Sequence, residues 1–543
     1  FGKWLENAND WNLSRSRYWG IPIPIWRTED GLEQKCISSV EELKNECQLS
    51  LEAGMMPNNP LADFAPGDMS EDNYNKVDLH KHIVDAMVLV SESGKAMHRE
   101  SDLMDVWFDS GSMPYAQWHY PFENKEKIEN NASYPADFIA EGVDQTRGWF
   151  YTLHAISSMV FGKVAYKNVV SNGLVLDKNG QKMSKRLGNG VDPFETLEKY
   201  GPDATRWYMI TNAQPWDNLK FDIEGIVEVQ RKFFGTLYNT YSFFSLYANV
   251  DEFDFSQEEI PLNERPEIDR WVLSKLNSLI KNVDEAYENY EPTKAGRLIQ
   301  EFVGDQLSNW YVRLCRRRFW KQSTDDSAGI KDKTSAYQTL YTCMETVAML
   351  GAPIAPFFMD QLFSDLNSVS KKYKFESIHL ADFPCVQEDH INVDLERQME
   401  IAQRTCSLVL GLRKKENIRV RQPLQKIMVP VLSDEFATNL KHVQDLILSE
   451  VNVKELELLT EDNNVLVKSI KPNFKTIGPK YGKHMKAIAG MVAQFSADDI
   501  ALVESNAGWT GEVNGDSISL DLGDFEIVAQ DIPGWLVSSE GNL

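Results

Sequence analysis

The chain has 543 residues, of which 42% are hydrophobic and 25% charged, and its formal net charge at pH 7 is −25. This composition excludes wholesale disorder, and no apolar run reaches the ~20 residues that cross a bilayer. Six scattered cysteines without a C-x-x-C pair favour a reducing compartment, so we expect three or four globular domains in the cytoplasm and no membrane partner.

The charges are distributed unevenly along the chain. The net negative charge by itself argues against a nucleic-acid partner, because phosphates would be repelled over much of the surface. Two basic islands interrupt the acidic body. They are Arg313, Arg316, Arg317, Arg318 and Lys321, and Arg413, Lys414, Lys415, Arg419, Arg421 and Lys426. Such islands are typical of a protein that binds a polyanion at a few defined sites only.

An irregular stretch runs from about residue 30 to residue 100. Its most loop-like part is residues 55–70, MMPNNPLADFAPGDMS. We interpret the stretch as an insertion in a mixed α/β region that spans residues 1 to about 225, and we expect no chemistry in it.

A β-α-β unit follows the insertion. Residues 134–142 predict a buried strand, residues 144–162 a helix with Asp144 as N-cap and Gly162 as stop, and residues 167–177 a strand and turn. This order predicts a parallel sheet with a right-handed crossover, in which ligands bind beyond the carboxyl ends of the strands. The residues at that edge are Glu141, Gly142, Asp144 and Gln145.

The pattern turns helical from about residue 225 to residue 390. The clearest apolar stripe lies in residues 267–287, and long helical patterns cover residues 293–320 and 336–366, the last interrupted by Pro353 and Pro356. We therefore expect a helix bundle. For Trp310, Tyr311 and Phe319 we expect ordinary core packing. After about residue 400 the pattern is mixed again, with strand alternation over residues 518–530.

Residues 180–189, GQKMSKRLGN, place Lys182, Lys185 and Arg186 within five positions and between glycines. Taken alone, this is typical of a solvated surface loop. The sequence has no G-x-x-x-x-G-K-[ST], no G-x-G-x-x-G and no G-x-S-x-G motif. An ATP site in this chain must therefore be of another design.

Five motifs follow one another along the chain. They are DWNLSRSRYWGIPIPIW (10–26), LMDVWFDSG (103–111), EGVDQTRGWF (141–150), NGLVLDKNGQKMSKRLGN (172–189) and LSNWYVRLCRRRFW (307–320). In this order and spacing they resemble class I aminoacyl-tRNA synthetases, and among these the isoleucyl enzymes, over at least residues 1–430.

The resemblance implies a fold of the α/β plus all-α class. The second half of a Rossmann-like catalytic domain is expected over residues 1–175, with the insertion at about 30–100. The lysine loop and a stem-contact region are expected over 176–225, an anticodon-binding helix bundle over 226–395, and a mixed α+β C-terminal region over 396–543.

The resemblance also implies site residues. KMSKR resembles the family's second signature loop, so Lys182 and Lys185 are the implied catalytic cations, placed to stabilise charge on the leaving pyrophosphate. Arg186 stands where the family usually has serine, which adds charge. The implied aminoacyl-adenylate site consists of Glu141, Gly142, Asp144, Gln145, Trp107 and Trp149. The implied ATP site consists of Asn172, Gly173, Met183, Ser184 and Lys185.

The implied function is activation of isoleucine with ATP and Mg²⁺, and transfer of isoleucine to tRNA(Ile) by a monomeric enzyme. Phosphate contacts with tRNA are implied for Arg313, Arg316, Arg317, Arg318 and Lys321. No metal-ligand set is recognised, although a longer parent enzyme could carry zinc. The family's histidine-containing first signature and its editing domain are not recognised, and the chain opens at Phe1. We therefore expect a C-terminal fragment that is inactive by itself.

Two alternatives stay open at this point. One is a valyl- or leucyl-tRNA synthetase, a sibling enzyme with a different amino-acid pocket. The other is a tRNA-binding module that has lost catalysis, which the retained Glu141, Asp144, Lys182 and Lys185 disfavour.

Overall fold

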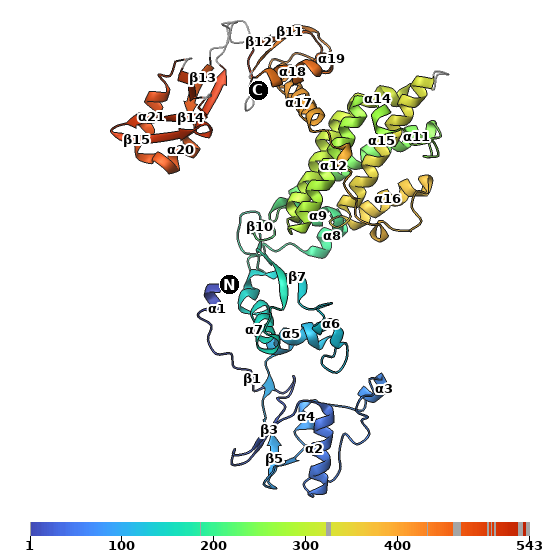
Figure 1. Ribbon diagram of the computed structural model, residues 1–543, viewed down its shortest axis with the longest axis vertical. Helices are drawn as coiled ribbons and strands as arrows, with labels where there is room; N and C mark the ends of the chain where they lie inside the picture. Colours follow the sequence, from blue (N-terminus) through green and yellow to red (C-terminus); the bar gives the residue numbers. More distant parts are fainter. Residues whose placement is uncertain are drawn as a thin grey trace. The chain divides into compact units, whose positions relative to one another are not determined.

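The computed structural model describes residues 2–184, 186–321, 327–431, 433–459, 468–496, 499–500, 502–503, 506–529 and 536–538. The chain divides into two compact units. The first consists of residues 1–229 and 286–294, and the second of residues 230–285 and 295–543. Figure 1 shows the elements of both units, which are described here one at a time.

The predicted β-α-β unit is present in the first unit, but its first strand is not buried as predicted: no residue of β7 is buried and Phe138 is 51% exposed, because the sheet has two strands instead of lying in the middle of a larger one. Strands β7 (Ala136–Gly142) and β8 (Tyr166–Asn172) pair in parallel, and helix α7 (Trp149–Phe161) connects them. Gly162 ends the helix with φ 64°, as predicted, because glycine enters the left-handed region without steric cost.

The predicted N-cap of this helix is wrong. A 3₁₀ turn, Val143–Arg147, precedes α7, and Gly148 occupies the capping position. The Asp144 side chain caps neither element; the Oε1 atom of Gln145 instead accepts the Trp149 backbone N–H at 2.9 Å. The extra turn moves the start of the helix five residues beyond Asp144, which periodicity alone could not reveal.

Helix α5 (Val106–Ala116) packs against α7 at a point where no side chain fits. A Cβ at Gly111 would lie 2.8 Å from the Ile156 side chain and 3.0 Å from the Thr152 backbone. Ile128, Tyr134, Leu153 and Ala165 form the buried core of this part of the unit. The other elements before β7 are α1 (Gly2–Leu5), β1 (Ser14–Arg15), α3 (Glu71–Tyr74), α4 (Lys81–Val84), β6 (Leu103–Met104) and α6 (Lys125–Glu129).

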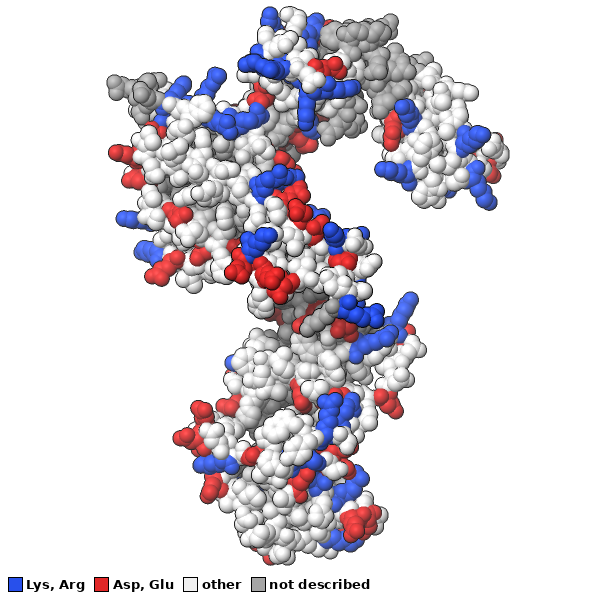
Figure 2. Space-filling view, turned by 180° about the vertical axis from the view of Figure 1, so that it is seen from behind, with Lys and Arg blue, Asp and Glu red and all other residues white. Residues whose placement is uncertain are grey.

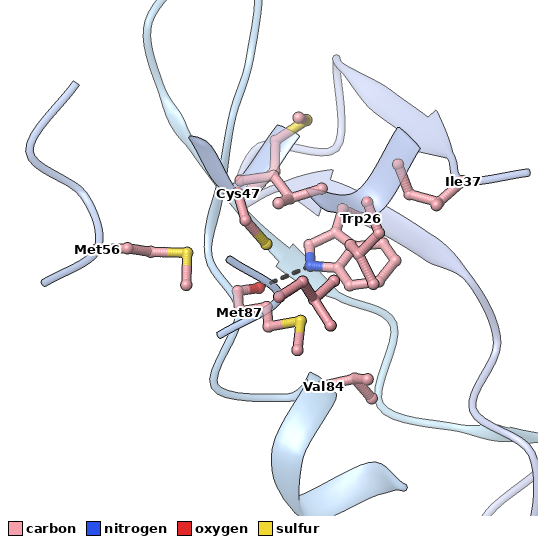
Figure 3. Close-up of a cluster of buried hydrophobic side chains, with 10 residues drawn as sticks. Trp26, Ile37, Cys47, Met56, Val84 and Met87 are labelled. Carbon is pink, nitrogen blue, oxygen red and sulfur yellow. Dashed lines mark hydrogen bonds between the residues drawn. The ribbon is translucent and has the colours of Figure 1, made fainter. Parts of the chain in front are cut away.

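The stretch expected to be irregular contains a small α+β fold with its own core. Its antiparallel sheet has the order β3-β2-β5-β4. The elements are β2 (Ile25–Thr28), β3 (Gln34–Cys36), β4 (Leu89–Val90), β5 (Ala96–Arg99) and α2 (Val40–Glu52). The buried Trp26 indole donates to the Met87 carbonyl at 2.7 Å within a cluster that includes Ile37 and Cys47 (Figure 3). Strands of two to four residues are too short to show a periodicity, which is why the sequence pattern looked irregular.

Five short elements follow β8 in the first unit. They are β9 (Val175–Leu176), α8 (Pro193–Tyr200), α9 (Pro202–Asn212), β10 (Leu219–Lys220) and α10 (Ile223–Val229). β9 and β10 pair in parallel, with Val175 opposite Leu219. Residues 286–294 complete the unit, and the Thr293 hydroxyl donates to the carbonyls of Ile210 and Ala213 at 2.6 and 3.0 Å.

The helix bundle is present in the second unit. Its helices are α11 (Gly235–Val250), α12 (Glu267–Glu288), α13 (Pro292–Glu301), α14 (Arg313–Trp320), α15 (Ser327–Gly351) and α16 (Pro356–Ser370); α12 and α13 extend into the residues of the first unit. The break between α15 and α16 falls where Pro353 and Pro356 were predicted to interrupt the helix, and Pro356 starts α16. A π-helix, Phe302–Val312, joins α13 to α14, which periodicity did not predict. Trp310, Tyr311 and Phe319 are buried, as expected.

The last part of the chain is mixed. Helix α17 (Val393–Lys415) leads into β11 (Leu424–Pro430), which pairs in parallel with β12 (Val453–Leu459) across α18 (Asp434–His442) and α19 (Gln444–Val451). The remaining elements are β13 (Lys468–Pro472), α20 (Phe474–Tyr481), α21 (Met485–Val492), β14 (Gly508–Val513), β15 (Asp516–Asp521) and β16 (Phe525–Ala529). Ile518 and Leu520 are buried while Ser517 and Ser519 are exposed, which confirms the alternation within β15; the 3₁₀ turn Leu522–Asp524 interrupts the strand predicted for residues 518–530, and residue 530 lies outside the described residues.

Candidate functional site

The two parallel strands present their carboxyl ends at one edge. Glu141 lies opposite Ser171 and Gly142 opposite Asn172 in the strand register. A Cβ at Gly142 would lie 2.6 Å from an Asp144 carboxylate oxygen, so the Asp144 side chain folds back closely over the strand end. The Gln145 amide donates to Asp144 at 3.2 Å. Glu141 and Asp144 are both exposed, so two carboxylates and an amide face solvent beyond the sheet edge.

The two indoles assigned to the amino-acid pocket have different settings. The Trp149 indole donates to the Ser110 carbonyl at 3.0 Å and packs against the core of α7. The Trp107 side chain is 41% exposed and lies over Gly148, where a Cβ would approach its ring to 3.3 Å. The structure thus brings Trp107, Gly148 and Gln145 together, with an open indole face.

Trp107 is held by a buried carboxylate that sequence reasoning missed. Asp105, which is 3% exposed, is the N-cap of α5 and accepts from the Trp107 backbone N–H. The same carboxylate accepts from the Trp11 indole at 2.9 Å and from the Arg15 guanidinium at 2.7 Å. Strand β1 pairs with β6, which ends directly before Asp105. Asp105 therefore connects the motif of residues 103–111 to the motif of residues 10–26. An Asp directly before an apolar helical segment is typical of an N-cap, so the order Asp-Val-Trp could have predicted this role for Asp105.

A pocket of about 340 Å³ lies beside Trp107, with Arg17, Trp19 and Asp109 in its wall. Among the described residues, Asp109 Oδ1 is buried without a hydrogen-bond partner. Burial, and then the charge of Asp105, raise the pKa of the Asp109 carboxyl above its usual value.

Gly173 follows β8 where two backbone segments nearly touch. A Cβ there would lie 2.2 Å from the Asp217 carbonyl oxygen, so no other residue fits without a shift. The Gly173 N–H donates to the Pro215 carbonyl at 2.8 Å. Asn172 and Gly173 line a mostly apolar pocket of about 440 Å³, together with Phe138, Val170, Val175 and Met209. This pocket is large enough for a planar ring system.

The lysine loop is a folded structure held by residues at its two ends. The Asp177 carboxylate accepts from the backbone N–H groups of Asn179 and Gln181 and from the Asn189 amide, at 2.8 to 2.9 Å. Asn189 Oδ1 in turn accepts from the Ser184 N–H at 2.9 Å. The Asn189 hydrogen bond, followed by that of Gln181, lowers the pKa of the Asp177 carboxyl. Sequence reasoning missed this pair, although Asp and Asn flanking a glycine-rich loop are a known turn signal.

Within this loop the candidate cations are only partly located. Lys182 forms a β-bridge with Leu176, and its side chain is exposed. Met183 and Ser184 are half-buried. Lys185 lies outside the described residues. Of the two implied catalytic lysines, the structure therefore places Lys182.

The first basic island contains two cations with ion-pair partners and three exposed cations that form no ion pair with the described residues. The Arg318 guanidinium contacts both oxygens of the fully buried Asp269, at 2.6 and 2.8 Å. Burial opposes the charge of Arg318, but the hydrogen bonds and charge of Asp269 outweigh it and raise its pKa. Arg313 forms an ion pair with Glu450. Arg316, Arg317 and Lys321 are exposed.

Neither a metal cluster nor a bilayer-spanning helix occurs in the described part of the chain. No group of three or more His, Cys, Asp or Glu side chains there could hold a metal ion. His80 stacks on Trp19 with ring centroids 4.3 Å apart, and Cys47 is buried in the core of the insertion. Within the same residues, no helix has both the length and the apolar character of a bilayer span.

Comparisons with known proteins show which domains the chain contains and which proteins it resembles. Residues 1–222 match the family model of class I tRNA synthetases (I, L, M and V), and residues 269–428 match that of the anticodon-binding domain of tRNA ligases. The isoleucine–tRNA ligases of Bacteroides fragilis and Cytophaga hutchinsonii are each 61% identical to the chain, over 100% of it and 47% of their own length. The chain therefore spans about half the length of the curated relatives it matches.

A similar fold occurs in a solved structure. It is a chain from the ternary complex LeuRS–tRNA–LeuAMS of Agrobacterium radiobacter, with a TM-score of 0.50 and 16% identity over 83% of this chain and 51% of that one. Both family models and the identity along the whole sequence agree, so the chain contains a class I tRNA synthetase domain over residues 1–222 and an anticodon-binding domain over residues 269–428, and its sequence is similar throughout to part of the isoleucine–tRNA ligases.

Proposed function

We propose that this chain supplies half of an active site for the ATP-dependent activation of isoleucine. In that reaction a carboxylate oxygen of isoleucine forms a bond to the α-phosphorus of ATP. The bond between that phosphorus and the bridging oxygen breaks, and pyrophosphate leaves. The isoleucyl group of the adenylate is then transferred to a terminal hydroxyl of tRNA(Ile), with release of AMP.

The observation that carries this proposal is the register of β7 and β8. Gly142 and Asn172 are directly opposite each other, and the lysine loop begins at Asp177, five residues after Asn172. Ligands of parallel sheets bind beyond such an edge. The register therefore supports a site in which the carboxylates beyond one strand and the cations of the loop after the other serve the same ligand.

The amino-acid end of the site is assigned to the residues beyond β7. Glu141 and Asp144 offer the negative charge that an α-ammonium group requires, and Gln145 offers a neutral amide. The Trp107 and Trp149 indoles offer apolar faces to a branched side chain. One methylene is worth only about 1–3 kcal/mol in a hydrophobic pocket, and the separation of isoleucine from valine by isoleucyl-tRNA synthetases is the standard example of this limit.

The phosphate end is assigned to the loop. Lys182 and Lys185 would stabilise negative charge on the β- and γ-phosphate oxygens as pyrophosphate leaves, which lowers the barrier more than it tightens ATP binding. The nucleotide would carry Mg²⁺ on its phosphates, where the cation neutralises part of their charge. Asn172 and Gly173 line the pocket that suits adenine.

The tRNA is assigned to the bundle in the second unit. Arg316, Arg317 and Lys321 are exposed on and just after α14 and could pair with phosphates. Arg318 and Arg313 face carboxylates of their own unit, so they support the helix rather than the RNA.

The test is isoleucine-dependent exchange of pyrophosphate into ATP by the parent enzyme, measured with isoleucine, valine and leucine. We expect isoleucine to be preferred, and a preference for valine or leucine would assign the chain to a sibling. The 543-residue chain alone should show no exchange, because the family's first signature is not recognised in it. Exchange by the chain alone would contradict that expectation. If pyrophosphate exchange is still absent after the remaining half of the parent enzyme is added, the chain is better explained as a non-catalytic tRNA-binding module.

A further inference from the structure

The turn between α17 and β11 is built around a buried arginine. Residues 413–423 (RKKENIRVRQP), which comprise the last three residues of α17 and the turn that follows them, are called the basic turn below. Arg413 is only 2% exposed, and burial lowers the pKa of its guanidinium. Among the described residues no carboxylate forms an ion pair with it. A buried cation without a counter-ion is costly, and hydrogen bonds to its guanidinium must offset that cost.

Those contacts are three backbone carbonyls. Arg413 Nη1 donates to the carbonyls of Arg419 and Gln422 at 3.2 and 3.0 Å, and Nη2 donates to the Asn452 carbonyl at 3.0 Å. Asn452 lies between α19 and β12. One side chain therefore fixes both arms of the turn against the sheet that follows it.

Two further features fix the backbone of the turn. The Ile418 N–H donates to the Arg413 carbonyl at 2.8 Å, and Asn417 has φ 57°, which is the Schellman ending of a helix. The Asn452 amide donates to the Val420 carbonyl at 2.8 Å. The turn is thus preorganised by side chains that point inward.

The other cations of the turn point to solvent. Lys414, Lys415, Arg419 and Arg421 are exposed, and no described carboxylate forms an ion pair with any of them. Glu416 is the one acidic residue of the turn. This differs from the first basic island, where Arg313 and Arg318 are paired. Blue side chains gather at the top of Figure 2, over the part that holds the end of α17 and β11.

We propose that the basic turn binds RNA phosphates of the tRNA, and that Arg413 is a positioning residue that holds the turn in its binding conformation. The proposal rests on the proposed function for its partner. Four free cations on a fixed backbone, in a chain of net charge −25, form a local site for a polyanion. The anticodon-binding family model ends at residue 428, so it includes the whole turn.

The charge is tested by tRNA(Ile) binding to the 543-residue chain, measured by filter binding over a series of salt concentrations. The variant is Arg419→Gln/Arg421→Gln, and the control is Lys371→Gln/Lys374→Gln, which removes two exposed lysines of the same unit. We expect the first variant to bind about tenfold more weakly and to reduce the salt slope by about 2, since each phosphate contact contributes about 1. The control should change neither.

The positioning role is tested with Arg413→Lys, which keeps the charge but cannot reach three carbonyls. We expect weaker tRNA binding with an unchanged circular dichroism spectrum. Asn452→Gly removes the amide contact to Val420 and tolerates the φ of 52° at this position; it should weaken binding in the same direction, so the claim stays testable if Arg413→Lys does not fold. Wild-type affinity in Asn452→Gly, or in a folded Arg413→Lys, would overturn the positioning role.

The remaining outcomes separate the two proposals. If the wild-type chain binds no tRNA, the proposed tRNA partner fails, and this inference fails with it. If the wild type binds and Arg419→Gln/Arg421→Gln binds equally well, only this inference fails. An equal loss of tRNA affinity in the Lys371→Gln/Lys374→Gln control would also overturn this inference, because the loss would then come from the change in net charge and not from the basic turn.

Discussion

The Asn189 amide donates to the Asp177 carboxylate at 2.9 Å and joins the two ends of the lysine loop. Asn189 also accepts from the Ser184 N–H, so one side chain fixes the loop at its end and in its middle. Lys182 lies between them, and its carbonyl receives a further contact from the Asn189 amide at 3.3 Å. The conformation of the loop thus depends on two residues outside the KMSKR motif.

The first prediction concerns that closure. Asn189→Ala removes three hydrogen bonds, each worth on the order of 1 kcal/mol, and should leave the loop poorly ordered. In the parent enzyme we expect a fall of about tenfold in the rate of pyrophosphate exchange, with little change in isoleucine affinity. Gly190→Ala, next to it in sequence with open space around its Cβ, is the control. Equal rates for wild type and Asn189→Ala would mean that the closure has no part in catalysis.

A second prediction concerns the cations themselves. Lys182→Ala in the parent enzyme should lower the activation rate by about 10²–10³, because an electrostatic contact to the leaving group is lost in the transition state. We expect the same for Lys185→Ala, on the sequence resemblance. Lys178→Ala removes an exposed lysine from the same loop and should have almost no effect. Pre-steady-state measurement of adenylate formation decides this, and an effect on isoleucine affinity alone would contradict the assigned role.

The third prediction concerns the buried ion pair of the bundle. Asp269 also accepts from the Tyr311 hydroxyl at 2.8 Å and from the Ser335 hydroxyl at 2.6 Å, besides Arg318. Arg318→Met should lower the free energy of unfolding by about 3–5 kcal/mol, because it leaves a buried carboxylate without its counter-ion. Arg316→Met, two residues away and exposed, should change it by less than about 0.5 kcal/mol. Urea denaturation followed by circular dichroism measures both, and similar values would show that Asp269 does not need Arg318.

A fourth prediction concerns the exposed cations of α14, Arg316 and Arg317. Arg316→Gln/Arg317→Gln should weaken tRNA(Ile) binding by the chain and reduce the salt slope by about 2, without a change in thermal stability. Arg397→Gln, a single exposed arginine that pairs with Glu435, is the control and should leave the slope unchanged. An unaltered slope in the double variant would remove these two residues from the RNA contact.

The fifth prediction concerns pH. The folded chain raises the pKa of Asp109, so the native state holds a proton that the unfolded state releases. The contribution of the Asp109 carboxyl to the free energy of unfolding is most favourable at low pH, and it is lost as pH rises through the pKa of the folded state. At pH 7, Asp109→Asn should therefore raise the free energy of unfolding by an amount on the order of 1 kcal/mol, and the melting temperature should rise with it. This gain should shrink as pH falls toward 4. Scanning fluorimetry from pH 4 to pH 8 checks this, and a gain that is constant with pH would exclude the titration as its cause.

Local sequence patterns predicted much of the fold. The helix of residues 267–287, the break at Pro353 and Pro356 and the stop at Gly162 are correct, because period and backbone chemistry act over a few residues. The parallel pairing of residues 136–142 with 166–172 also followed from the order strand, helix, strand. The irregular structure predicted for residues 30–100 was wrong, since the core of this stretch joins residues as distant as Trp26 and Met87 through strands of only a few residues.

In the candidate site, too, some features follow from the sequence and others only from the tertiary structure. The sequence by itself determined the family, the lysine loop and the residue types at the sheet edge, because motif order and chain connectivity are written along the chain. Only the tertiary structure decided which charges are free. Arg318 and Arg413 look like surface cations in sequence, yet one is bound to Asp269 and the other to three carbonyls. Burial and partner choice depend on contacts between segments far apart in sequence, and no local pattern encodes them.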